Sequence, residues 1–594
     1  MMRQGLLIHS QVLENARDNI ITNVEPSADL ADSCVDYLAQ LGVEAVFGVP
    51  GGAIEPLYNA LARSQRRHGV KAVVARHESG AAFMAQGYAR ETGKPGVCCT
   101  TTGPGATNVL TAVASAYWDE TPLLVITGQT PAANIARGAL QDSSNSGVDT
   151  LSLFQNCTRY NALVAEPAQF ERLFVQALQS MYGDPPGPVH LSIAPDVFRR
   201  KIPHSIRLDM QRHVRRARVI DIAQVNVLAD EIAKASRPVI LIGEFCQRGV
   251  CEIVAVAERL NIQFATTPGA KGLVASAHPL YVGVFGFAGH AAAREALVNP
   301  QVDLAIAVGT RLGEWDTMGW DEAALLNNKL IHVDQYCVHF SYSPMARMQV
   351  FGDIAAIFSA LSARFSTPAP QSGRLSNVFD QPKVAARLHF PAPTAGVSPI
   401  AVMQWLKNTM SADTCVYVDA GNSSCWGVHY LDSFGPNTHI PEGQDWFRMS
   451  TQFASMGWGI GNAIGAAYGN RGRLFVCVTG DGSWLMNGQE FTVAVAEQLP
   501  MLFIILNDQA YGMVKHGQRM ANAEPIAFEL PKVDFCLMAQ AMGGTARRVN
   551  NLQELYAITP EIINFDGPVV VDIIIDGEAV PPMQTRVKVL EAAL

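Results

Sequence analysis

The sequence predicts an α/β protein with three domains, each containing a parallel sheet flanked by helices. The chain has 594 residues, which is too long for a single hydrophobic core. Short apolar runs alternate with helical patterns along most of its length, as parallel sheets require. Its composition, 48% hydrophobic and 16% charged, is typical of a well-buried globular protein and excludes a disordered or fibrous one.

The apolar runs fall into three sets, which define the expected domains at residues 28–197, 215–365 and 398–590. Strands of the first domain are expected at 46–49, 72–74, 97–100, 123–126 and 189–193. Strands of the second are expected at 238–243, 304–309 and 329–333. Strands of the third are expected at 415–419, 474–478, 502–506 and 569–575. An intervening helix returns the chain to the same end of the sheet, so the strands of each set should be parallel.

Two connecting segments separate these sets. Residues 366–397 are rich in proline, serine, glutamine and asparagine and show no sustained period, which is typical of a linker crossing the surface. A shorter basic segment, 199–218, joins the first two domains. Its charge run indicates a solvated face rather than a binding site.

Charge and cysteine content exclude several classes of protein. The net charge of -9 leaves no excess of lysine and arginine to neutralise a phosphate backbone, so a nucleic-acid partner is not expected. No run approaches the roughly 20 apolar residues needed to cross a bilayer, so we expect no membrane partner and a cytoplasmic location. The 11 cysteines include no CxxC pair, and the run containing Cys98 and Cys99 predicts buried, reduced thiols.

The most informative segment is Gly480-Asp481-Gly482-Ser483, which directly follows an expected strand. A helical pattern follows, beginning near residue 487. Glycines at such a turn let the backbone approach an anion, and a helix N-terminus offers free N–H groups to a phosphate. The next expected strand ends at Asp508, so Asp481 and Asp508 could share a cation, and oxygen ligands beside a diphosphate favour Mg²⁺. Read alone, however, a GDG sequence is also a common turn.

Taken together, these motifs resemble the thiamine diphosphate signature of the acetolactate synthase family, whose second acidic position is usually asparagine where this chain has Asp508. Three upstream segments, 47–53 (FGVPGGA), 76–82 (RHESGAA) and 103–108 (GPGATN), resemble the pyrimidine-side motifs of the same family. The resemblance extends from residue 28 to 590. It implies pyrimidine-binding, central and diphosphate-binding α/β domains, as in thiamine diphosphate-dependent carboligases and decarboxylases.

The resemblance also implies roles for individual residues. Glu78 would hydrogen-bond the pyrimidine ring and so promote the tautomer that deprotonates the thiazolium carbon, while Gln141 would lie near the substrate carbonyl. The other implied cofactor-binding residues are Pro50, Pro104, Asn108, Gly421, Asn422, Ser423, Met456, Gly482, Ser483, Tyr511, Gly512 and Met513. The implied metal ligands are Asp481, Asp508 and the carbonyl of Ala510. In this family the two groups of motifs come from different subunits, which implies a homodimer or homotetramer with its sites at the subunit interface.

Three departures from the family cluster on the acceptor side of the reaction. Trp315 stands where biosynthetic members carry an arginine associated with the acceptor acid, and Gly517 stands where they carry a tryptophan. Compared with the family, the segment 142–149 contains an insertion of about five residues after Gln141. Loss of a guanidinium that grips a carboxylate should weaken selection for a charged acceptor, unless a cation such as Arg159 replaces it. The changed central domain also fails to indicate a flavin, so FAD is not expected.

We therefore expect a Mg²⁺- and thiamine diphosphate-dependent carboligase. It would decarboxylate a 2-oxo acid, pyruvate in the first instance, and join the acyl group to a second carbonyl acceptor. The alternatives are a 2-oxo acid decarboxylase that releases an aldehyde, a flavin-dependent oxidase, and a catalytically silent regulatory paralogue. Retention of Glu78, Met456 and Asp481 argues against the last of these.

Overall fold

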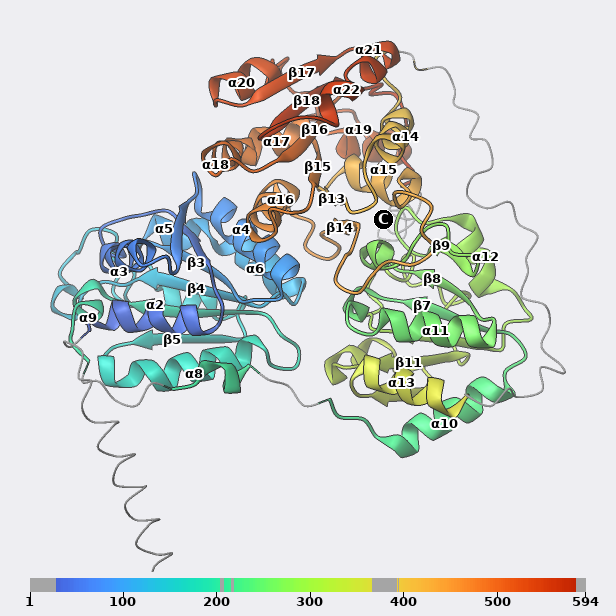
Figure 1. Ribbon diagram of the computed structural model, residues 1–594, viewed down its shortest axis with the longest axis horizontal. Helices are drawn as coiled ribbons and strands as arrows, with labels where there is room; N and C mark the ends of the chain where they lie inside the picture. The colour runs from blue at the N-terminus through green and yellow to red at the C-terminus, as the bar shows by residue number, and fades with distance from the viewer. Residues whose placement is uncertain (1–27, 203–207, 215–217, 366–392, 394, 584–594) are drawn as a thin grey trace, which may run out of the picture.

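The computed structural model describes residues 28–202, 208–214, 218–365, 393 and 395–583. It confirms three α/β domains, each with a six-stranded, all-parallel sheet (Figure 1). Most of the expected linker at 366–397 and part of the basic connector at 199–218 lie outside the described residues. Within the described residues, no helix combines the length and apolar character that a membrane span requires.

The N-terminal domain has the sheet order β2-β1-β3-β4-β6-β5. Its strands are β1 (Ala45–Gly48), β2 (Lys71–Val74), β3 (Gly96–Thr100), β4 (Leu123–Gly128), β5 (Tyr160–Val164) and β6 (Pro188–Ile193). Its helices are α2 (Leu30–Gln40), α3 (Glu55–Arg66), α4 (Glu78–Thr92), α5 (Pro104–Asn108), α6 (Leu110–Trp118), α7 (Thr150–Phe154), α8 (Phe170–Met181) and α9 (Pro195–Phe198). Val46 and Phe47 belong to different hydrophobic clusters, so both faces of the sheet are covered. Cys98 and Cys99 are fully buried in β3, as predicted.

The C-terminal domain repeats this topology, with the order β14-β13-β15-β16-β18-β17. Its strands are β13 (Cys415–Val418), β14 (Phe447–Met449), β15 (Phe475–Gly480), β16 (Met501–Asn507), β17 (Thr545–Val549) and β18 (Val569–Ile574). Its helices are α14 (Pro399–Thr409), α15 (Asn422–Tyr430), α16 (Trp458–Gly469), α17 (Asp481–Asn487), α18 (Phe491–Ala496), α19 (Gly512–Met520), α20 (Phe535–Ala541), α21 (Leu552–Ala557) and α22 (Thr559–Ile562). The helix expected to begin near residue 487 in fact begins at Asp481, because β15 leads into α17 with no intervening loop.

The central domain has a different order, β12-β11-β10-β7-β8-β9. Its strands are β7 (Pro238–Ile242), β8 (Gln263–Thr266), β9 (Tyr281–Val284), β10 (Leu304–Val308), β11 (Leu330–Asp334) and β12 (Met348–Phe351). Its helices are α10 (Ile222–Lys234), α11 (Val250–Leu260), α12 (Ala291–Val298) and α13 (Ile354–Arg364). The chain order reverses between β7 and β10, which is the arrangement of doubly wound nucleotide-binding folds.

Helices α4 and α16 join the N-terminal and C-terminal domains and lie side by side in Figure 1. Glycines let their backbones touch: a Cβ at Gly87 would lie 1.9 Å from the Asn462 carbonyl oxygen, and one at Gly465 would lie 1.8 Å from the Met84 carbonyl oxygen. One hydrophobic cluster therefore runs through both domains. This contact fixes the first turn of α4, where Glu78 lies, against the diphosphate-side domain of its own chain.

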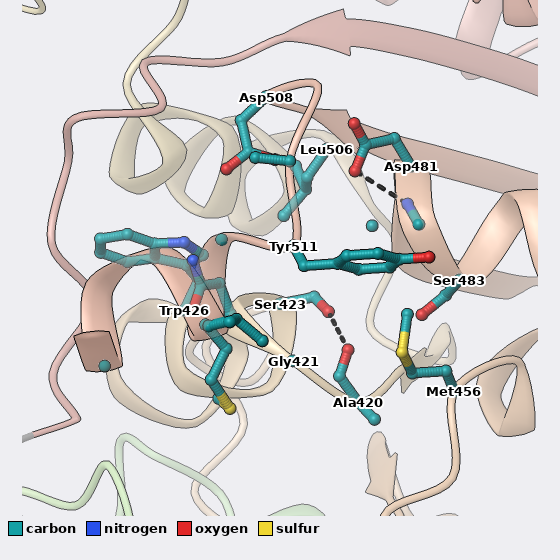
Figure 2. Close-up of a pocket in the computed structure, with 18 of the residues that line it drawn as sticks. Ala420, Gly421, Ser423, Trp426, Met456, Asp481, Ser483, Leu506, Asp508 and Tyr511 are labelled. Atoms are coloured by element: carbon teal, nitrogen blue, oxygen red, sulfur yellow. Dashed lines mark hydrogen bonds between the residues drawn. The ribbon is translucent and has the colours of Figure 1, made fainter. Parts of the chain in front are cut away.

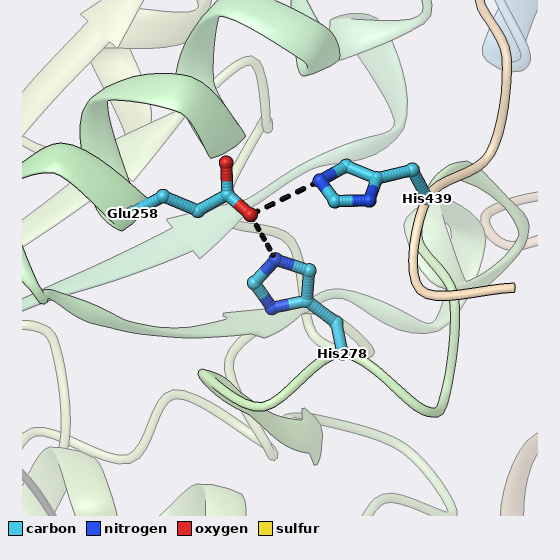
Figure 3. A group of neighbouring side chains, drawn as sticks. All are labelled: Glu258, His278 and His439. Carbon is cyan, nitrogen blue, oxygen red and sulfur yellow. Dashed lines mark hydrogen bonds and ion pairs between the residues drawn. The ribbon is translucent and has the colours of Figure 1, made fainter.

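A polar cluster joins the central and C-terminal domains (Figure 3). The Nε2 atoms of His278 and His439 lie 3.1 and 3.0 Å from Oε1 of Glu258, close enough for the three side chains to be considered as metal ligands. However, Nδ1 of His278 accepts a hydrogen bond from the Leu280 N–H (3.2 Å), so the neutral ring carries its proton on Nε2. That nitrogen donates to Glu258 and has no lone pair for a metal. The cluster therefore links the central and C-terminal domains by hydrogen bonds.

Candidate active site

A cavity of about 420 Å³ opens at the carboxyl ends of the C-terminal strands (Figure 2). All of the residues predicted for the diphosphate side line it: Gly421, Asn422, Ser423, Met456, Asp481, Gly482, Ser483, Asp508, Ala510, Tyr511, Gly512 and Met513. They come from the ends of β13, β15 and β16 and from the segment before α16. The topology thus brings together residues that are nearly a hundred positions apart in the sequence.

Two helices begin at this cavity, which gives it the character of an anion site. Helix α15 starts at Asn422, after Gly421 in the left-handed region (φ +95), and α17 starts at Asp481. N–H groups without a helical partner at such helix starts favour a phosphate, although the Gly482 N–H at the start of α17 donates to Oδ1 of Asp481 (2.8 Å). Oδ1 of Asn422 is buried and has no hydrogen-bond partner among the described residues, so this side chain has bonding capacity to spare, and its Nδ2 is the group that could donate to a phosphate. The Ser423 hydroxyl instead contacts the carbonyl oxygens of Asp419 (3.0 Å) and Ala420 (3.1 Å), so its proton is committed to the backbone.

Asp481 and Asp508 form the acidic part of the cavity and lie on the same side of the Tyr511 ring in Figure 2. Burial, together with the charge of Asp508, raises the pKa of Asp481 to about 7. Burial likewise raises the pKa of Asp508 to about 6, against the opposing effect of Lys515. A cation between two buried acids would stabilise their charged forms, and their oxygens suit Mg²⁺. The residues present therefore fit a metal-bound diphosphate.

Tyr511 and Met456 pack close to this acidic pair. A Cβ at Gly482 would lie 2.7 Å from Cε1 of Tyr511 and 3.3 Å from Cε of Met456, so only glycine fits there. Gly512 is equally constrained, since its Cβ would lie 2.4 Å from Nδ2 of Asn422. These close contacts explain why glycine stands at both positions.

The predicted pyrimidine-side residues gather elsewhere, at the carboxyl ends of the N-terminal sheet. Glu78 is the first residue of α4 and is only 8% exposed, and Nδ2 of Asn108 donates to its Oε2 (3.0 Å). Pro104 begins α5, and the preceding Gly103 packs so closely on Gln141 that a Cβ there would lie 2.6 Å from the Gln141 Cβ. Pro50 follows β1 at the same end of the sheet. None of these five residues lines the cavity of its own chain.

The 142–149 segment is anchored next to Gln141 by one carboxylate. Asp142 accepts hydrogen bonds from the Ser144 N–H (2.9 Å) and the Thr130 hydroxyl (2.9 Å). Hydrogen bonding by Ser144 is the main cause of its pKa falling to about 2. The segment is therefore built around an ionised aspartate.

Glu490 is a buried acid that the sequence reasoning missed. Its carboxylate is fully buried and accepts hydrogen bonds from the backbone N–H of His77 (2.8 Å) and of Arg76 (3.1 Å), directly before Glu78. Burial raises the pKa of Glu490 to about 7, and the charge of Glu78 adds to this effect. A carboxylate just after the GDGS helix was the only available signal, because its partners come from the other end of the chain.

Charged side chains fill the carboxyl ends of the central strands, at the reversal between β7 and β10. His339 bridges Asp334 (3.0 Å) and Glu120 of the N-terminal domain (2.9 Å). Arg311 donates to the Trp118 carbonyl and lies 3.7 Å from Glu120. Burial opposes the charge of His339, yet the hydrogen bonds that its ring donates to the two carboxylates raise its pKa to about 9. The chain's own side chains therefore occupy the position where a nucleotide lies in doubly wound folds.

Comparison with known proteins agrees with this geometry. Residues 28–149 match the thiamine pyrophosphate enzyme N-terminal TPP-binding domain, 225–361 the central domain, and 419–573 the C-terminal TPP-binding domain. The large subunits of acetolactate synthase isozymes 1 and 2 of Escherichia coli are each 30% identical, over 92% and 94% of this chain and 94% and 98% of theirs. A probable 2-ketoarginine decarboxylase, AruI of Pseudomonas aeruginosa, is 31% identical over 88% of this chain and 89% of its own.

The three matching domains and the spacing of the cavity residues define a thiamine pyrophosphate-dependent enzyme. The chain belongs to the acetolactate synthase family of these enzymes.

Proposed function

We propose that this enzyme is a Mg²⁺-dependent carboligase that decarboxylates a 2-oxo acid, pyruvate in the first instance, and joins the acyl group to a second carbonyl compound. The observation that carries the proposal is the meeting of two helix starts and two buried acids, Asp481 and Asp508, in one cavity. Acetolactate synthases of similar sequence over nearly the whole chain support the same reaction class.

The chain's own residues would bind and orient the cofactor. Asn422 and the N–H groups at the starts of α15 and α17 would hold the diphosphate, and Asp481, Asp508 and the Ala510 carbonyl would hold Mg²⁺. Met456 would wedge between the two cofactor rings. When bound, thiamine diphosphate would supply a nucleophilic carbon that attacks the substrate carbonyl and a thiazolium ring that accepts the electron pair as carbon dioxide leaves.

Glu78 would hold a proton at the pyrimidine ring nitrogen. Its hydrogen bond from Asn108 and its place at a helix N-terminus fix the carboxyl group in one orientation. Gln141 would donate a hydrogen bond to the substrate carbonyl. Because these residues do not line the cavity of their own chain, the complete site requires a second protomer, and we propose a homo-oligomer with its sites between subunits.

A flavin is not part of the proposal. The side chains of Arg311 and His339 lie at the carboxyl ends of the central strands and contact the N-terminal domain, which supports this view. A visible absorption spectrum of the purified protein tests directly whether it contains a flavin.

One rival activity has a specific observation in its favour. A relative described as a probable 2-ketoarginine decarboxylase matches most of the chain, so release of an aldehyde is the second candidate. Incubation with pyruvate and a panel of aldehydes and oxo acids, with products identified by mass, decides between the two. Products with a new carbon–carbon bond support the carboligase, whereas acetaldehyde as the sole product supports the decarboxylase. A protein that binds the cofactor and consumes no oxo acid would be a silent paralogue.

A further inference from the structure

Part of the cavity wall is apolar and lacks positive charge, and its residues are not among those assigned to the cofactor. Trp315 supplies it from the central domain, and Val514 and Gly517 supply it from α19. Residues from two domains therefore form this part of the wall.

Trp315 is a fixed surface rather than a mobile side chain. Its ring stacks on Phe287, with centroids 4.1 Å apart and planes 12° from parallel. The Phe287 N–H donates to the Trp315 carbonyl (2.7 Å), and Gly286, at φ +116, lies so close that a Cβ there would be 2.1 Å from the same oxygen. Both the backbone and the ring of Trp315 are thus held in place.

The loop that carries Trp315 is tied down on both sides. The Thr310 hydroxyl donates to Asp316 (2.9 Å), and the Thr317 hydroxyl donates to the Gly313 carbonyl (2.8 Å). These bonds flank the tryptophan and keep it at the cavity wall.

Gly517 leaves open space in the same wall. An ideal Cβ at this position meets no atom within 4 Å. The neighbouring Val514 is half exposed, so an apolar side chain borders this open space.

The nearby cationic side chains bind groups outside the cavity. Among the described residues that line the cavity, the charged ones are Asp481 and Asp508, and none is lysine, arginine or histidine. Arg311, in the loop of Trp315, points to the N-terminal domain. Lys515 donates to the Gly577 carbonyl (3.0 Å) and pairs with Glu578 (2.7 Å).

Arg159, the possible replacement cation, is committed as well. Its guanidinium lies 3.9 Å from the Tyr117 ring centroid and donates to the Pro186 carbonyl (3.3 Å).

We propose that Trp315 and the space at Gly517 form an acceptor subsite for an uncharged carbonyl compound with a flat apolar body, such as an aromatic aldehyde, in preference to a second 2-oxo acid. An aromatic face stacks well on a fixed indole, whereas the described residues that line this cavity offer an acceptor carboxylate no lysine, arginine or histidine. This inference rests on the carboligase activity proposed above.

The reaction balances without an oxidant. Pyruvate loses its carboxylate as carbon dioxide, the acyl carbon forms a new bond to the aldehyde carbon, and the aldehyde oxygen takes up one proton. With benzaldehyde the product is an aromatic 2-hydroxy ketone.

The test uses the full-length enzyme loaded with thiamine diphosphate and Mg²⁺, with pyruvate as donor and benzaldehyde, acetaldehyde or 2-oxobutyrate as competing acceptors. We expect benzaldehyde to outcompete 2-oxobutyrate. Loss of the stacking surface in Trp315→Ala should raise the KM for benzaldehyde roughly three- to tenfold and change that for acetaldehyde less. Trp315→Phe should retain most of the preference, and Trp320→Ala, which alters an exposed tryptophan in the same loop, should leave it unchanged.

A binding measurement complements the kinetics. Saturation-transfer NMR with benzyl alcohol, an unreactive neutral ligand, should show weaker binding to Trp315→Ala and to Gly517→Trp, which fills the open space, than to Gly517→Ala.

The outcomes separate this inference from the proposed function. Carboligation that favours 2-oxobutyrate, or a benzaldehyde KM indifferent to Trp315, overturns the acceptor subsite and leaves the carboligase standing. If Trp315→Ala instead raises the KM of an aromatic donor such as phenylpyruvate, the surface serves the donor and the assignment is wrong. Absence of any carbon–carbon product refutes the proposed function itself.

Discussion

The N-terminal and C-terminal domains have the same strand order but place different chemistry at the carboxyl ends of their strands. The C-terminal domain presents two helix starts and the acids Asp481 and Asp508 around a cavity. The N-terminal domain presents Glu78, which accepts a hydrogen bond from Asn108, and Gln141, which packs against Gly103. The shared topology provides equivalent positions, and the loops at those positions determine what each domain does.

Each domain thus supplies half of the proposed site. In this proposal the C-terminal half would bind the charged diphosphate and its metal ion, and the N-terminal half would hold the activating proton. Changes confined to one half should therefore give different failures, which makes the comparison testable.

The largest effect is expected from Asp481→Ala in the C-terminal half. Loss of one hard oxygen ligand should abolish Mg²⁺-dependent cofactor binding, measured by isothermal calorimetry. Asp566→Ala, which removes an exposed acid of the same domain, is the matched control. Unchanged cofactor affinity in the Asp481 variant would count against the metal assignment.

In the N-terminal half, Glu78→Gln should keep the fold and the cofactor affinity but reduce turnover by roughly 10²–10⁴-fold, because the amide cannot hold the activating proton. Circular dichroism, calorimetry and carbon dioxide release measure these three properties separately. Turnover close to that of the wild type would remove the role of Glu78.

The contact between the halves is tested by Gly465→Ala. The added methyl would lie 1.8 Å from the Met84 carbonyl oxygen, so α4 and α16 must move apart, at a cost of roughly 1–3 kcal/mol of unfolding free energy. Urea denaturation measures the change. Gly472→Ala is the control, since its Cβ would meet only Asn470 Oδ1, at 3.7 Å. Equal stability of the two variants would contradict the close packing of the helices.

A smaller effect is expected from Glu490→Gln, which alters the link between the C-terminal half and the residues before Glu78. Burial raises the pKa of Glu490 from 4.5 to about 7, so the folded chain holds this proton over a pH range in which the unfolded chain has lost it. The corresponding stability is complete below pH 4.5 and is lost as pH rises to about 7. The urea midpoint of the wild type should fall relative to that of the variant between pH 5 and pH 8. Parallel pH profiles would show that Glu490 does not titrate there.

The strands and motifs that could be predicted from the sequence are each encoded within a short stretch of consecutive residues. Inner strands such as β4 and β16 are continuous apolar runs because both faces are buried. Edge strands such as β5 and β17 mix polar and apolar residues because one side is solvated, and they were not predicted.

The candidate site shows the same limit. The resemblance identified Asp481, Asp508 and Glu78 as site residues, and the structure places the two aspartates at one cavity. The contact of Glu490 with the backbone before Glu78 depends on how α4 packs against the C-terminal domain, and no local pattern carries that information. The stacking of Trp315 on Phe287 is likewise a tertiary contact.

The most direct test of a site shared between protomers is complementation between Glu78→Gln and Asp481→Ala chains. A mixed dimer would contain one site with both wild-type residues and one with neither. Two inactive variants mixed at equal amounts and allowed to exchange subunits should recover about a quarter of wild-type turnover. Absence of recovery, although native mass spectrometry shows mixed oligomers, would contradict the account.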